Sequence, residues 1–341
     1  MSEVVLVTGA SGFIAQHVIL RLLRAGHHVR GTVRSAARGD HVLAVLASHG
    51  APLERVELVE ADLTADAGWP EAVSGCRFVM HVASPAPPRP PKHEDELIVP
   101  ARDGTLRVLA AAASAGVERV VLTSSISAVL YGHARDGSRI YTEDDWSELT
   151  AGVGAYEKSK TLAERAAWDF VSRLPPDRFL ELCTINPGLV LGPILEKEFS
   201  VSGEVVRKLL KRELPGCPDI GFAVVDVRDV ADAHLAAIER PEAAGQRFIV
   251  GLEHTSMLEI ATILDRHCRP RGYRVPLRPV PGWLLKTVAL FDKTAALAVQ
   301  ELGKRQDVSS QRARDVLGFS PRSLEEAVTS MADSMIQHAV V

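Results

Sequence analysis

Short apolar runs rich in β-branched residues alternate with helix-type patterns through the first two-thirds of this 341-residue sequence. Six runs are typical of strands: 3–8, 27–34, 55–61, 77–83, 119–125 and 178–186. Several are apolar almost throughout, as expected for strands buried on both faces of a parallel sheet. Helix-type patterns lie between them, at 12–25, 38–49, 95–115 and 154–173. Each strand–helix–strand unit spans roughly 30 residues, so the pattern predicts a doubly wound α/β sheet.

The alternation stops after Pro187. The segment 188–221 is mixed and rich in turn residues, 222–251 returns to strand, helix and strand, and the remainder is mainly helix-type. We therefore expect a Rossmann-type dinucleotide domain from 1–187 plus 222–251, and a smaller C-terminal substrate lobe from 188–221 plus 252–341. Within the lobe, 282–299 is expected to form one helix. Its wide apolar face would pack on the body of the protein, or else serve as a substrate lid or partner surface.

A glycine-rich turn separates the first predicted strand from the first predicted helix, in VLVTGASGFIAQHVILRLLRAG at 5–26. Gly9 allows a sharp turn, Gly12 allows the backbone to approach a pyrophosphate, and Ala15 allows helix and strand to pack closely. The alternative is a purely structural turn. Directly after a buried strand and at the start of an apolar-periodic helix, the motif favours a dinucleotide site.

The end of the second predicted strand indicates which dinucleotide binds. NAD sites usually carry an acid about 20 residues after the glycine turn, where it holds the ribose 2′-hydroxyl. This strand ends in Arg34 instead, and Arg38 follows four residues later. Guanidinium groups suit a 2′-phosphate, so the sequence favours NADP(H) over the alternative of solvated arginines. Asp62 and Leu63 follow the third strand, where an acid can accept a hydrogen bond from the adenine amino group.

A catalytic constellation is expected at the end of the fifth strand. Ser124 and Ser125 lie there, and ligands of open parallel sheets bind beyond the carboxyl ends of the strands. Tyr156 and Lys160 follow at i and i+4 of a predicted helix, and therefore on one face. A lysine cation lowers the pKa of a tyrosine toward the range useful for proton transfer. Ser125 would hydrogen-bond a carbonyl oxygen beside the tyrosine hydroxyl.

Composition excludes several other classes of protein. Apolar residues make up 46% and charged residues 24%, and the formal net charge is −4 with no basic block, so we expect neither nucleic-acid nor membrane binding. Four unpatterned cysteines are typical of a reducing cytoplasm. The twelve histidines show no ligand spacing, so we expect no metal.

With these motifs in place, the sequence resembles the extended short-chain dehydrogenase/reductases over nearly its whole length. The resemblance rests on TGASGFIA, DL, VMHVASP, VPARDGTLRVL, TSS with YEKSK, NPGLVLGP, VDVRDVADAHL and LGFSPRSLEEAV. The second strand ending in TVR is similar to the branch that contains dihydroflavonol 4-reductases, cinnamoyl-CoA reductases and NADPH-dependent aldehyde reductases. Leu130 stands where plant dihydroflavonol reductases carry an Asn, which disfavours a flavonoid substrate. The long aromatic- and cysteine-rich motif of cinnamoyl-CoA reductases has no counterpart, which disfavours a CoA thioester.

The resemblance implies roles for particular residues. Ser125 would orient the carbonyl, Tyr156 would be the general acid–base, and Lys160 would also bond the nicotinamide ribose. We expect the cofactor to contact Thr8, Gly9, Ser11, Gly12, Phe13, Ile14, Arg34, Arg38, Asp62, Leu63, Val82, Ala83, Ser84, Thr123, Tyr156, Lys160, Pro187, Gly188 and Val190. The expected walls of the substrate pocket are Ser84, Pro85, Ser125, Ile126, Ser127, Leu191 and Pro193.

The expected function is NADPH-dependent reduction of an aldehyde or ketone to an alcohol, by a monomer or homodimer acting on a small molecule. The alternatives are a hydroxysteroid dehydrogenase, a nucleotide-sugar epimerase or dehydratase of the same fold, and a non-catalytic protein that senses NADP(H).

Other polar residues are given structural interpretations. We expect His81 to be a core histidine and His234 to be structural. We expect Glu143, Asp144 and Asp145 to form a solvated loop, and Glu157, Lys158, Glu164 and Arg165 to meet solvent or the neighbouring surface.

Overall fold

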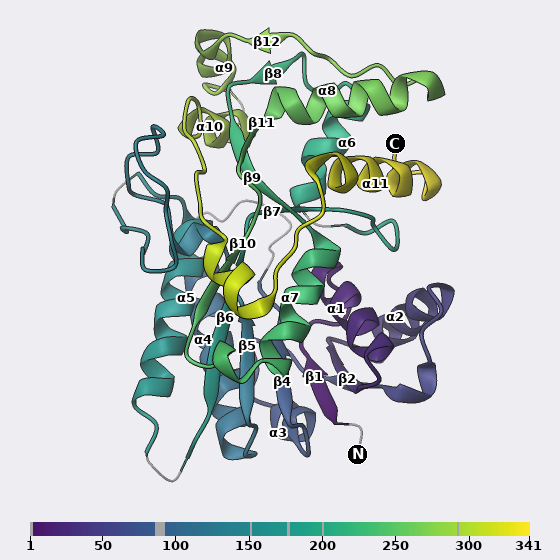
Figure 1. The fold of residues 1–341 in the computed structure, drawn as a ribbon, viewed down its shortest axis with the longest axis vertical. Coiled ribbons are helices and arrows are strands. Elements are labelled where there is room, and N and C mark those ends of the chain that lie inside the picture. Colours follow the sequence, from purple (N-terminus) through teal and green to yellow (C-terminus); the bar gives the residue numbers. More distant parts are fainter. Residues whose placement is uncertain (1–2, 86–92, 151, 176–177, 200, 292) are drawn as a thin grey trace.

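Seven strands form one parallel sheet in the order β10-β6-β5-β4-β1-β2-β3 (Figure 1). The computed structural model describes residues 3–85, 93–150, 152–175, 178–199, 201–291 and 293–341. The strands of this sheet are β1 (Val4–Val7), β2 (His28–Val33), β3 (Val56–Glu60), β4 (Phe78–His81), β5 (Arg119–Thr123), β6 (Glu181–Pro187) and β10 (Arg247–Val250). The order reverses direction between β1 and β4, as in a doubly wound Rossmann-type sheet. The predicted fold class is confirmed.

Helices cover both faces of the large sheet, because alternate side chains of each strand point to opposite faces. On β1, Val5 and Val7 belong to one buried cluster and Leu6 to another, and Met80 and Val79 of β4 divide in the same way. The first cluster packs under α1 (Phe13–Arg24), α2 (Ala36–Ser48) and α7 (Val227–Glu239). The second packs under α3 (Trp69–Val73), α4 (Asp95–Ser114) and α5 (Ala155–Ser172). Burial on both faces explains the apolar strand sequences.

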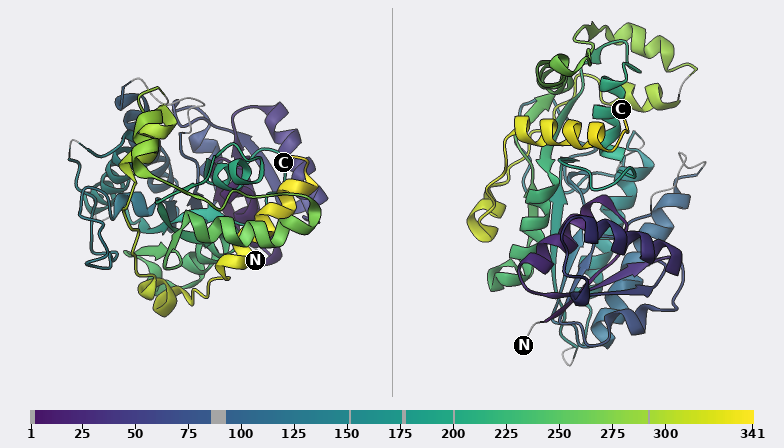
Figure 2. Two further views of the ribbon diagram at one scale, coloured as in Figure 1. Left: turned by 90° about the horizontal axis from the view of Figure 1, so that it is seen from above. Right: turned by 90° about the vertical axis from the view of Figure 1, so that its right-hand side faces the viewer.

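A smaller lobe lies over one end of the large sheet in both side views (Figures 1 and 2). Its short strands are β7 (Leu189–Leu191), β8 (Cys217–Pro218), β9 (Gly221–Asp226), β11 (His254–Ser256) and β12 (Pro279–Val280). They form a three-stranded sheet, β11-β9-β7, and a two-stranded sheet, β12-β8. The helices of this part are α6 (Glu204–Leu210), α8 (Met257–Cys268), α9 (Gly282–Val288), α10 (Lys293–Gln300) and α11 (Leu324–Gln337). Within the segment 222–251, β10 belongs to the large sheet and α7 covers a face of that sheet. The third element, β9, pairs with β7 and β11. The division into domains stays a prediction.

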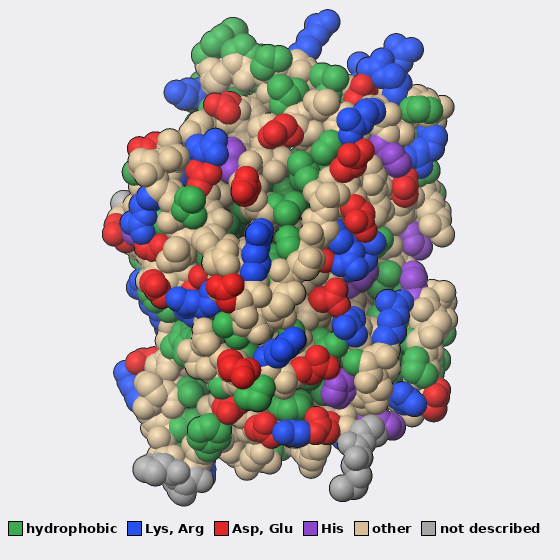
Figure 3. All heavy atoms as spheres, in the orientation of Figure 1, with side chains coloured by type: hydrophobic (Ala, Val, Ile, Leu, Met, Phe, Trp, Pro, Cys, Tyr) green, Lys and Arg blue, Asp and Glu red, His purple; other side chains and the backbone are tan. Residues whose placement is uncertain are grey.

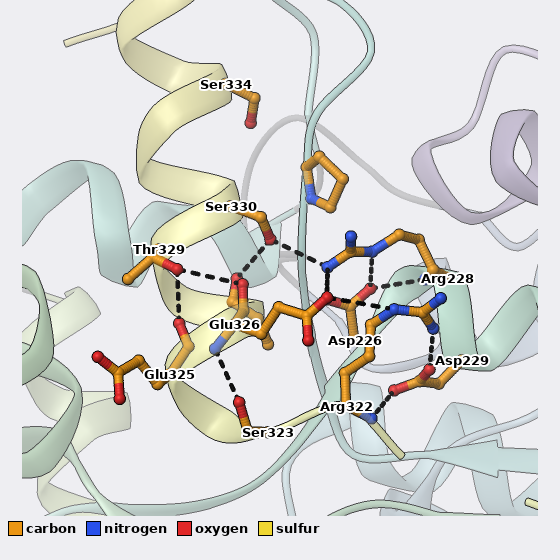
Figure 4. Close-up of polar contacts among 12 residues, drawn as sticks. Asp226, Arg228, Asp229, Arg322, Ser323, Glu325, Glu326, Thr329, Ser330 and Ser334 are labelled. Carbon is orange, nitrogen blue, oxygen red and sulfur yellow. Dashed lines mark hydrogen bonds and ion pairs between the residues drawn. The ribbon is translucent and has the colours of Figure 1, made fainter. Parts of the chain in front are cut away.

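The C-terminal helix is fastened to α7 by a cluster of charges (Figure 4). The Asp226 carboxylate caps α7 by accepting a hydrogen bond from the backbone N–H of Arg228, 2.8 Å away. Arg228 also pairs with that carboxylate and with Glu326 of α11. Arg322, just before α11, pairs with Asp229. The motifs VDVRDVADAHL and LGFSPRSLEEAV, far apart in the sequence, therefore form one contact region.

The expectation of a single helix over 282–299 is wrong. Two shorter helices, α9 and α10, occupy this stretch, and the described part of it does not pack fully on the body. No residue of α9 is buried, and Trp283 and Phe291 are 69% and 90% exposed. The apolar side chains of α9 find too few partners to hold one long helix against the protein surface.

Acidic and basic side chains are interspersed on the face drawn in Figure 3. Among the described residues, no helix combines the length and the apolar character that crossing a bilayer requires.

Candidate active site

The glycine turn at the end of β1 adopts a conformation that requires its small residues. Gly9 has φ +69°, a left-handed conformation that side chains rarely adopt, and a Cβ there would lie 3.0 Å from the Cβ of Ala83. Gly12 precedes the first residue of α1, and no side chain caps this helix end. Ala15 is fully buried. The turn therefore presents backbone N–H groups and the positive end of the helix dipole at the edge of the sheet.

Hydrogen bonds connect this turn to the end of β4. The Thr8 hydroxyl accepts a hydrogen bond from the backbone N–H of Ala83 (2.9 Å) and pairs with Nδ1 of His81 (2.9 Å). Burial lowers the pKa of His81 to about 3, so the ring is neutral at physiological pH. His81 is thus a buried histidine, as expected, and it fixes the two strand ends that are predicted to hold the nicotinamide half of a cofactor.

Two arginines lie near the end of β2, as the sequence analysis requires of a 2′-phosphate site. Arg34 is exposed at the strand end. The Arg38 guanidinium, on α2, donates two hydrogen bonds to the carboxylate of Glu198. Asp62 accepts hydrogen bonds from the hydroxyl and backbone N–H of Thr64, which hold the pKa of its carboxyl below the usual value. The Asp62 carboxylate therefore stays ionised, and its hydrogen bonds with Thr64 fix its orientation.

The segment after β7 is fastened across α1 and α2. The carboxylate of Glu196 accepts a hydrogen bond from Nε2 of Gln16 (2.5 Å) and pairs with His41. Nε2 of His17 lies 2.9 Å from the carbonyl oxygen of Pro193. Together with the Arg38–Glu198 pair, these contacts attach the 193–198 segment to α1 and α2, next to one of the arginines expected to bind the 2′-phosphate. Neither glutamate was among the expected site residues, since no local sequence pattern marks their partners.

Ser125 is the second residue after β5 and caps the short 3₁₀ turn Ile126–Ala128. Its Oγ accepts a hydrogen bond from the backbone N–H of Ser127 (3.1 Å), which leaves its own proton free to be donated. Its carbonyl oxygen accepts a hydrogen bond from Nδ2 of Asn186 (3.2 Å), on the neighbouring strand β6. The serine is therefore held from two sides at the carboxyl edge of the sheet.

Tyr156 and Lys160 lie on the first turns of α5, and the Lys160 Nζ is 6.0 Å from the centre of the Tyr156 ring. Tyr156 is 47% exposed, so a substrate can reach it. The hydroxyl end of the ring is nevertheless enclosed, and this burial raises the pKa of the hydroxyl, whereas hydrogen bonding with Ser125 lowers it. Burial lowers the pKa of Lys160 to about 8, and the nearby charge of Glu164 opposes that effect. Serine, tyrosine and lysine therefore meet at one edge of the sheet, although their catalytic roles stay predictions.

The remaining predicted contacts divide between this edge and the interior. Gly188 lies where a Cβ would be 1.9 Å from the carbonyl oxygen of Ala223, so only glycine fits. The Thr123 hydroxyl pairs with Nε2 of His234 (2.7 Å), which confirms a structural position for that histidine. Four of the predicted contact residues are buried in hydrophobic clusters: Phe13, Ile126, Val190 and Leu191. Ser84 is exposed, and Pro85 is partly exposed. Among the described residues, no group of three or more metal-ligating side chains is arranged around one point.

These residues fit a nicotinamide dinucleotide. The glycine turn leaves room for a pyrophosphate, the arginines after β2 supply positive charge, and the Ser125, Tyr156 and Lys160 side chains lie at the same sheet edge. A family model for the NAD dependent epimerase/dehydratase family matches residues 5–251. The chain belongs to this family. The resemblance to the extended short-chain dehydrogenase/reductases is thereby confirmed.

Relatives of this epimerase/dehydratase-family chain include several reductases. It is 37% identical to cinnamoyl-CoA reductase CAD2 of Medicago truncatula, over 73% of this chain and 76% of the relative. It is 30% identical to the NADPH-dependent methylglyoxal reductase GRE2 of Saccharomyces cerevisiae, over 98% of both chains. The crystal structure of yeast methylglyoxal/isovaleraldehyde reductase Gre2 complexed with NADPH superposes with a TM-score of 0.82, at 28% identity and 99% coverage of both chains.

In this family member, the structure corrects two expectations about charged side chains. Glu164 does not meet solvent: it is fully buried on α5. Glu143 is not part of a solvated loop, because its carboxylate is buried and accepts a hydrogen bond from the backbone N–H of Ile249 (3.0 Å). Asp144 is exposed, as expected. The i+4 spacing from Lys160 to Glu164 was the one sequence signal that could have placed the glutamate on the buried face.

Proposed function

We propose that this protein is an NADPH-dependent carbonyl reductase that converts an aldehyde or ketone into an alcohol. The observation that carries the proposal is the meeting of Ser125, Tyr156 and Lys160 at the carboxyl edge of the sheet, beside the glycine turn. The likeness to NADPH-dependent reductases over almost the whole chain supports it. The two arginines near the end of β2 favour the 2′-phosphorylated cofactor.

The chain's own residues account for the proton chemistry. The Ser125 hydroxyl, whose oxygen already accepts the Ser127 N–H, donates to the substrate oxygen and polarises the carbonyl. Tyr156 donates the proton that converts this oxygen into a hydroxyl. The Lys160 ammonium, with a pKa of about 8, is mainly protonated at pH 7 and stabilises the tyrosinate that forms. When bound, the nicotinamide supplies the hydride that reduces the carbonyl carbon.

The proposed contacts follow from the same placement. Thr8, Gly9, Ser11, Gly12 and Ile14 would hold the pyrophosphate half, with Arg34 and Arg38 on the 2′-phosphate. Ser84, Pro85 and Pro193 would border the substrate. A largely apolar carbonyl compound of modest size suits this setting, in line with a relative named as a methylglyoxal/isovaleraldehyde reductase.

The proposed setting is a reducing cytoplasm, with the protein as a monomer or homodimer. Its four cysteines, all free, are buried, as expected where disulfides do not form. The dinucleotide domain of 1–187 plus 222–251 would bind the cofactor, and the remaining lobe would close over the substrate.

A nucleotide-sugar epimerase or dehydratase is the weaker candidate, because epimerases of this fold usually hold NAD with an acid where Arg34 stands. A non-catalytic NADP(H) sensor is also weaker, since Ser125, Tyr156 and Lys160 are all present.

A panel assay following NADPH consumption tests the proposal. We expect the purified protein to oxidise NADPH with at least one class of aldehyde or ketone, methylglyoxal and isovaleraldehyde included. Tyr156→Phe should retain NADPH binding, measured by quenching of tryptophan fluorescence, and lose about 10²-fold or more in kcat. Wild-type protein that binds NADPH yet reduces nothing in a broad panel, steroid ketones included, would contradict the reductase and favour the sensor.

A further inference from the structure

Glu164 is a fully buried carboxylate on the same helix as the two predicted catalytic residues. It lies one turn after Lys160 and two turns after Tyr156 on α5, so the three positions follow one side of the helix. A charged group is rarely buried to this extent unless specific partners compensate for the loss of water. The hydrogen-bond and ion-pair partners of Glu164 therefore indicate its role.

The Glu164 carboxylate joins α5 to three adjacent strands. It accepts hydrogen bonds from the Ser124 hydroxyl (2.5 Å) after β5, and from the Thr184 hydroxyl (3.0 Å) and Asn186 Nδ2 (2.8 Å) on β6. It also accepts from Nε of Arg247 (2.7 Å), the first residue of β10. Trp168 Nε1 is a fifth and longer donor (3.4 Å), and few side chains offer two oxygens that can accept so many hydrogen bonds at once.

Arg247 supplies the compensating positive charge and is itself held in place. Its Nη1 donates to the backbone carbonyl oxygens of Glu143 (2.6 Å) and Asp145 (2.7 Å). Its guanidinium lies 3.7 Å from the centre of the Trp146 ring. Glu164 and Arg247 thus form an ion pair in which both side chains are buried, and further contacts hold each of the two in place.

The same network reaches the predicted catalytic residues. Ser124, which donates to Glu164, is bonded along the chain to Ser125. Asn186, which also donates to Glu164, donates to the carbonyl oxygen of Ser125 (3.2 Å). On the helix itself, the charge of Glu164 raises the pKa of Lys160, against the effect of burial.

Other titratable groups lie on α5 and on the elements near it. On α5 itself, Glu157 precedes Lys160 by three residues, and burial raises the pKa of its carboxyl. His81, on β4, has its pKa lowered to about 3 and carries no charge at working pH. On α7, burial lowers the pKa of His234 to about 4. On α4, Glu94 pairs with Lys158, and Arg102 pairs with Asp103.

We propose that Glu164 is a positioning residue of the catalytic site, which holds α5, and with it Tyr156 and Lys160, against the ends of β5 and β6 through hydrogen bonds from Ser124 and Asn186 and an ion pair with Arg247. The inference rests on the proposed function, since it assigns Glu164 a task in that reaction. Glu164 touches neither substrate nor cofactor in this account. It acts through Ser124, Asn186 and Lys160.

A matched pair of substitutions separates charge from shape. Glu164→Gln keeps the size of the side chain and removes the charge, whereas Glu164→Asp keeps the charge and shortens the reach. We expect the basic limb of the kcat/KM profile for carbonyl reduction to move about one pH unit lower in E164Q, because Lys160 then loses its proton earlier. The pKa read from this basic limb is a property of the coupled Tyr156–Lys160 pair and not of either residue alone. In E164D the limb should stay at its wild-type pH, although kcat falls because the contacts to the strands lengthen.

Two further variants serve as controls for this experiment. Asp169→Asn removes a carboxylate from the exposed side of the same helix, where it pairs only with Arg173, and should leave the profile unchanged. If E164Q alone does not fold, E164Q combined with Arg247→Leu removes both buried charges, which avoids an unpaired arginine. The double variant should move the basic limb in the same direction but by less, because loss of the Arg247 cation by itself favours a protonated Lys160.

A direct titration keeps this test separate from that of the proposed function. The pH dependence of acylation at Lys160, followed by mass spectrometry of the labelled peptide, gives the pKa of this lysine without any substrate. A lower value in E164Q than in wild type and E164D supports the proposal even if no carbonyl in the panel is reduced. An unchanged value and an unmoved limb in E164Q, or equal movements in E164Q and E164D, would show that Glu164 serves only the stability of the fold.

Discussion

The guanidinium of Arg38 on α2 is paired with the carboxylate of Glu198 in the segment that follows β7. Arg38 is one of the two arginines that we expect to bind the 2′-phosphate of NADPH. A phosphate at this point must therefore share the guanidinium with Glu198 or displace it. The carboxylate of the chain and the phosphate of the cofactor compete for the same donor groups.

Glu198→Gln should consequently tighten NADPH binding. The Glu198 side chain is mostly exposed, so solvent screening limits the effect to about 0.5 kcal/mol, roughly a two- to threefold lower Kd. Affinity for NADH, which lacks the phosphate, should not change. Isothermal titration with both cofactors measures the difference.

Arg34→Ala is the contrasting variant for this prediction. Loss of a charged hydrogen-bonding partner should weaken NADPH binding about tenfold, again without an effect on NADH. Equal changes for both cofactors in either variant would place the 2′-phosphate elsewhere.

Gly188→Ala should destabilise the protein, because a Cβ there would lie 1.9 Å from the carbonyl oxygen of Ala223. Forcing the chain at the start of β7 away from β9 should cost about 1–3 kcal/mol of unfolding free energy, measured by urea denaturation. Gly152→Ala is the matched control, since no heavy atom lies within 4 Å of a Cβ built at that position. Similar urea midpoints for the two variants would refute the close approach.

Acid should destabilise the protein through its buried histidines. Burial lowers the pKa of His17 and His234 from 6.5 to about 4, so between these values the unfolded chain binds more protons than the folded one. The part of the unfolding free energy that depends on these two neutral histidines is retained in full above pH 6.5 and is lost as the pH falls toward 4. Each histidine should add about 1.4 kcal/mol per pH unit to the slope of unfolding free energy in this interval.

His234→Gln isolates one of these contributions. The slope between pH 4.5 and 6.5 should be flatter in the variant than in wild type by about that amount, whatever the change in absolute stability. A slope that does not change would mean that His234 is protonated, or equally accessible to protons, in the folded protein.

Many features of the fold could be predicted from local patterns. The strand and helix segments of the first two-thirds agree with the structure, because the period of apolar residues records which side of each element is covered. Gly26 and Gly50 follow apolar-periodic stretches, and both have positive φ, +92° and +75°, as is common for a glycine just after a helix end. The glycine turn and the i, i+4 spacing of Tyr156 and Lys160 are equally local.

The errors concern residues whose environment is made by distant parts of the chain. Glu164 and Glu143 are as polar as their exposed neighbours, and nothing nearby in the sequence shows that Arg247 and Ile249 will face them. The stretch 282–299 has enough apolar residues for one helix. In the folded protein, however, α9 is not covered by other described segments, and none of its residues is buried.

The sequence by itself determined the order of strands and helices, the turn that suits a dinucleotide, and the spacing of the predicted catalytic residues. These depend on backbone sterics and on hydrogen bonds between residues a few positions apart. Only the tertiary structure decided that Glu164 is buried and which charge compensates it, since its ion-pair partner Arg247 lies 83 residues away. The free energy of a buried charge depends on the groups that surround it in space, and sequence distance does not encode them.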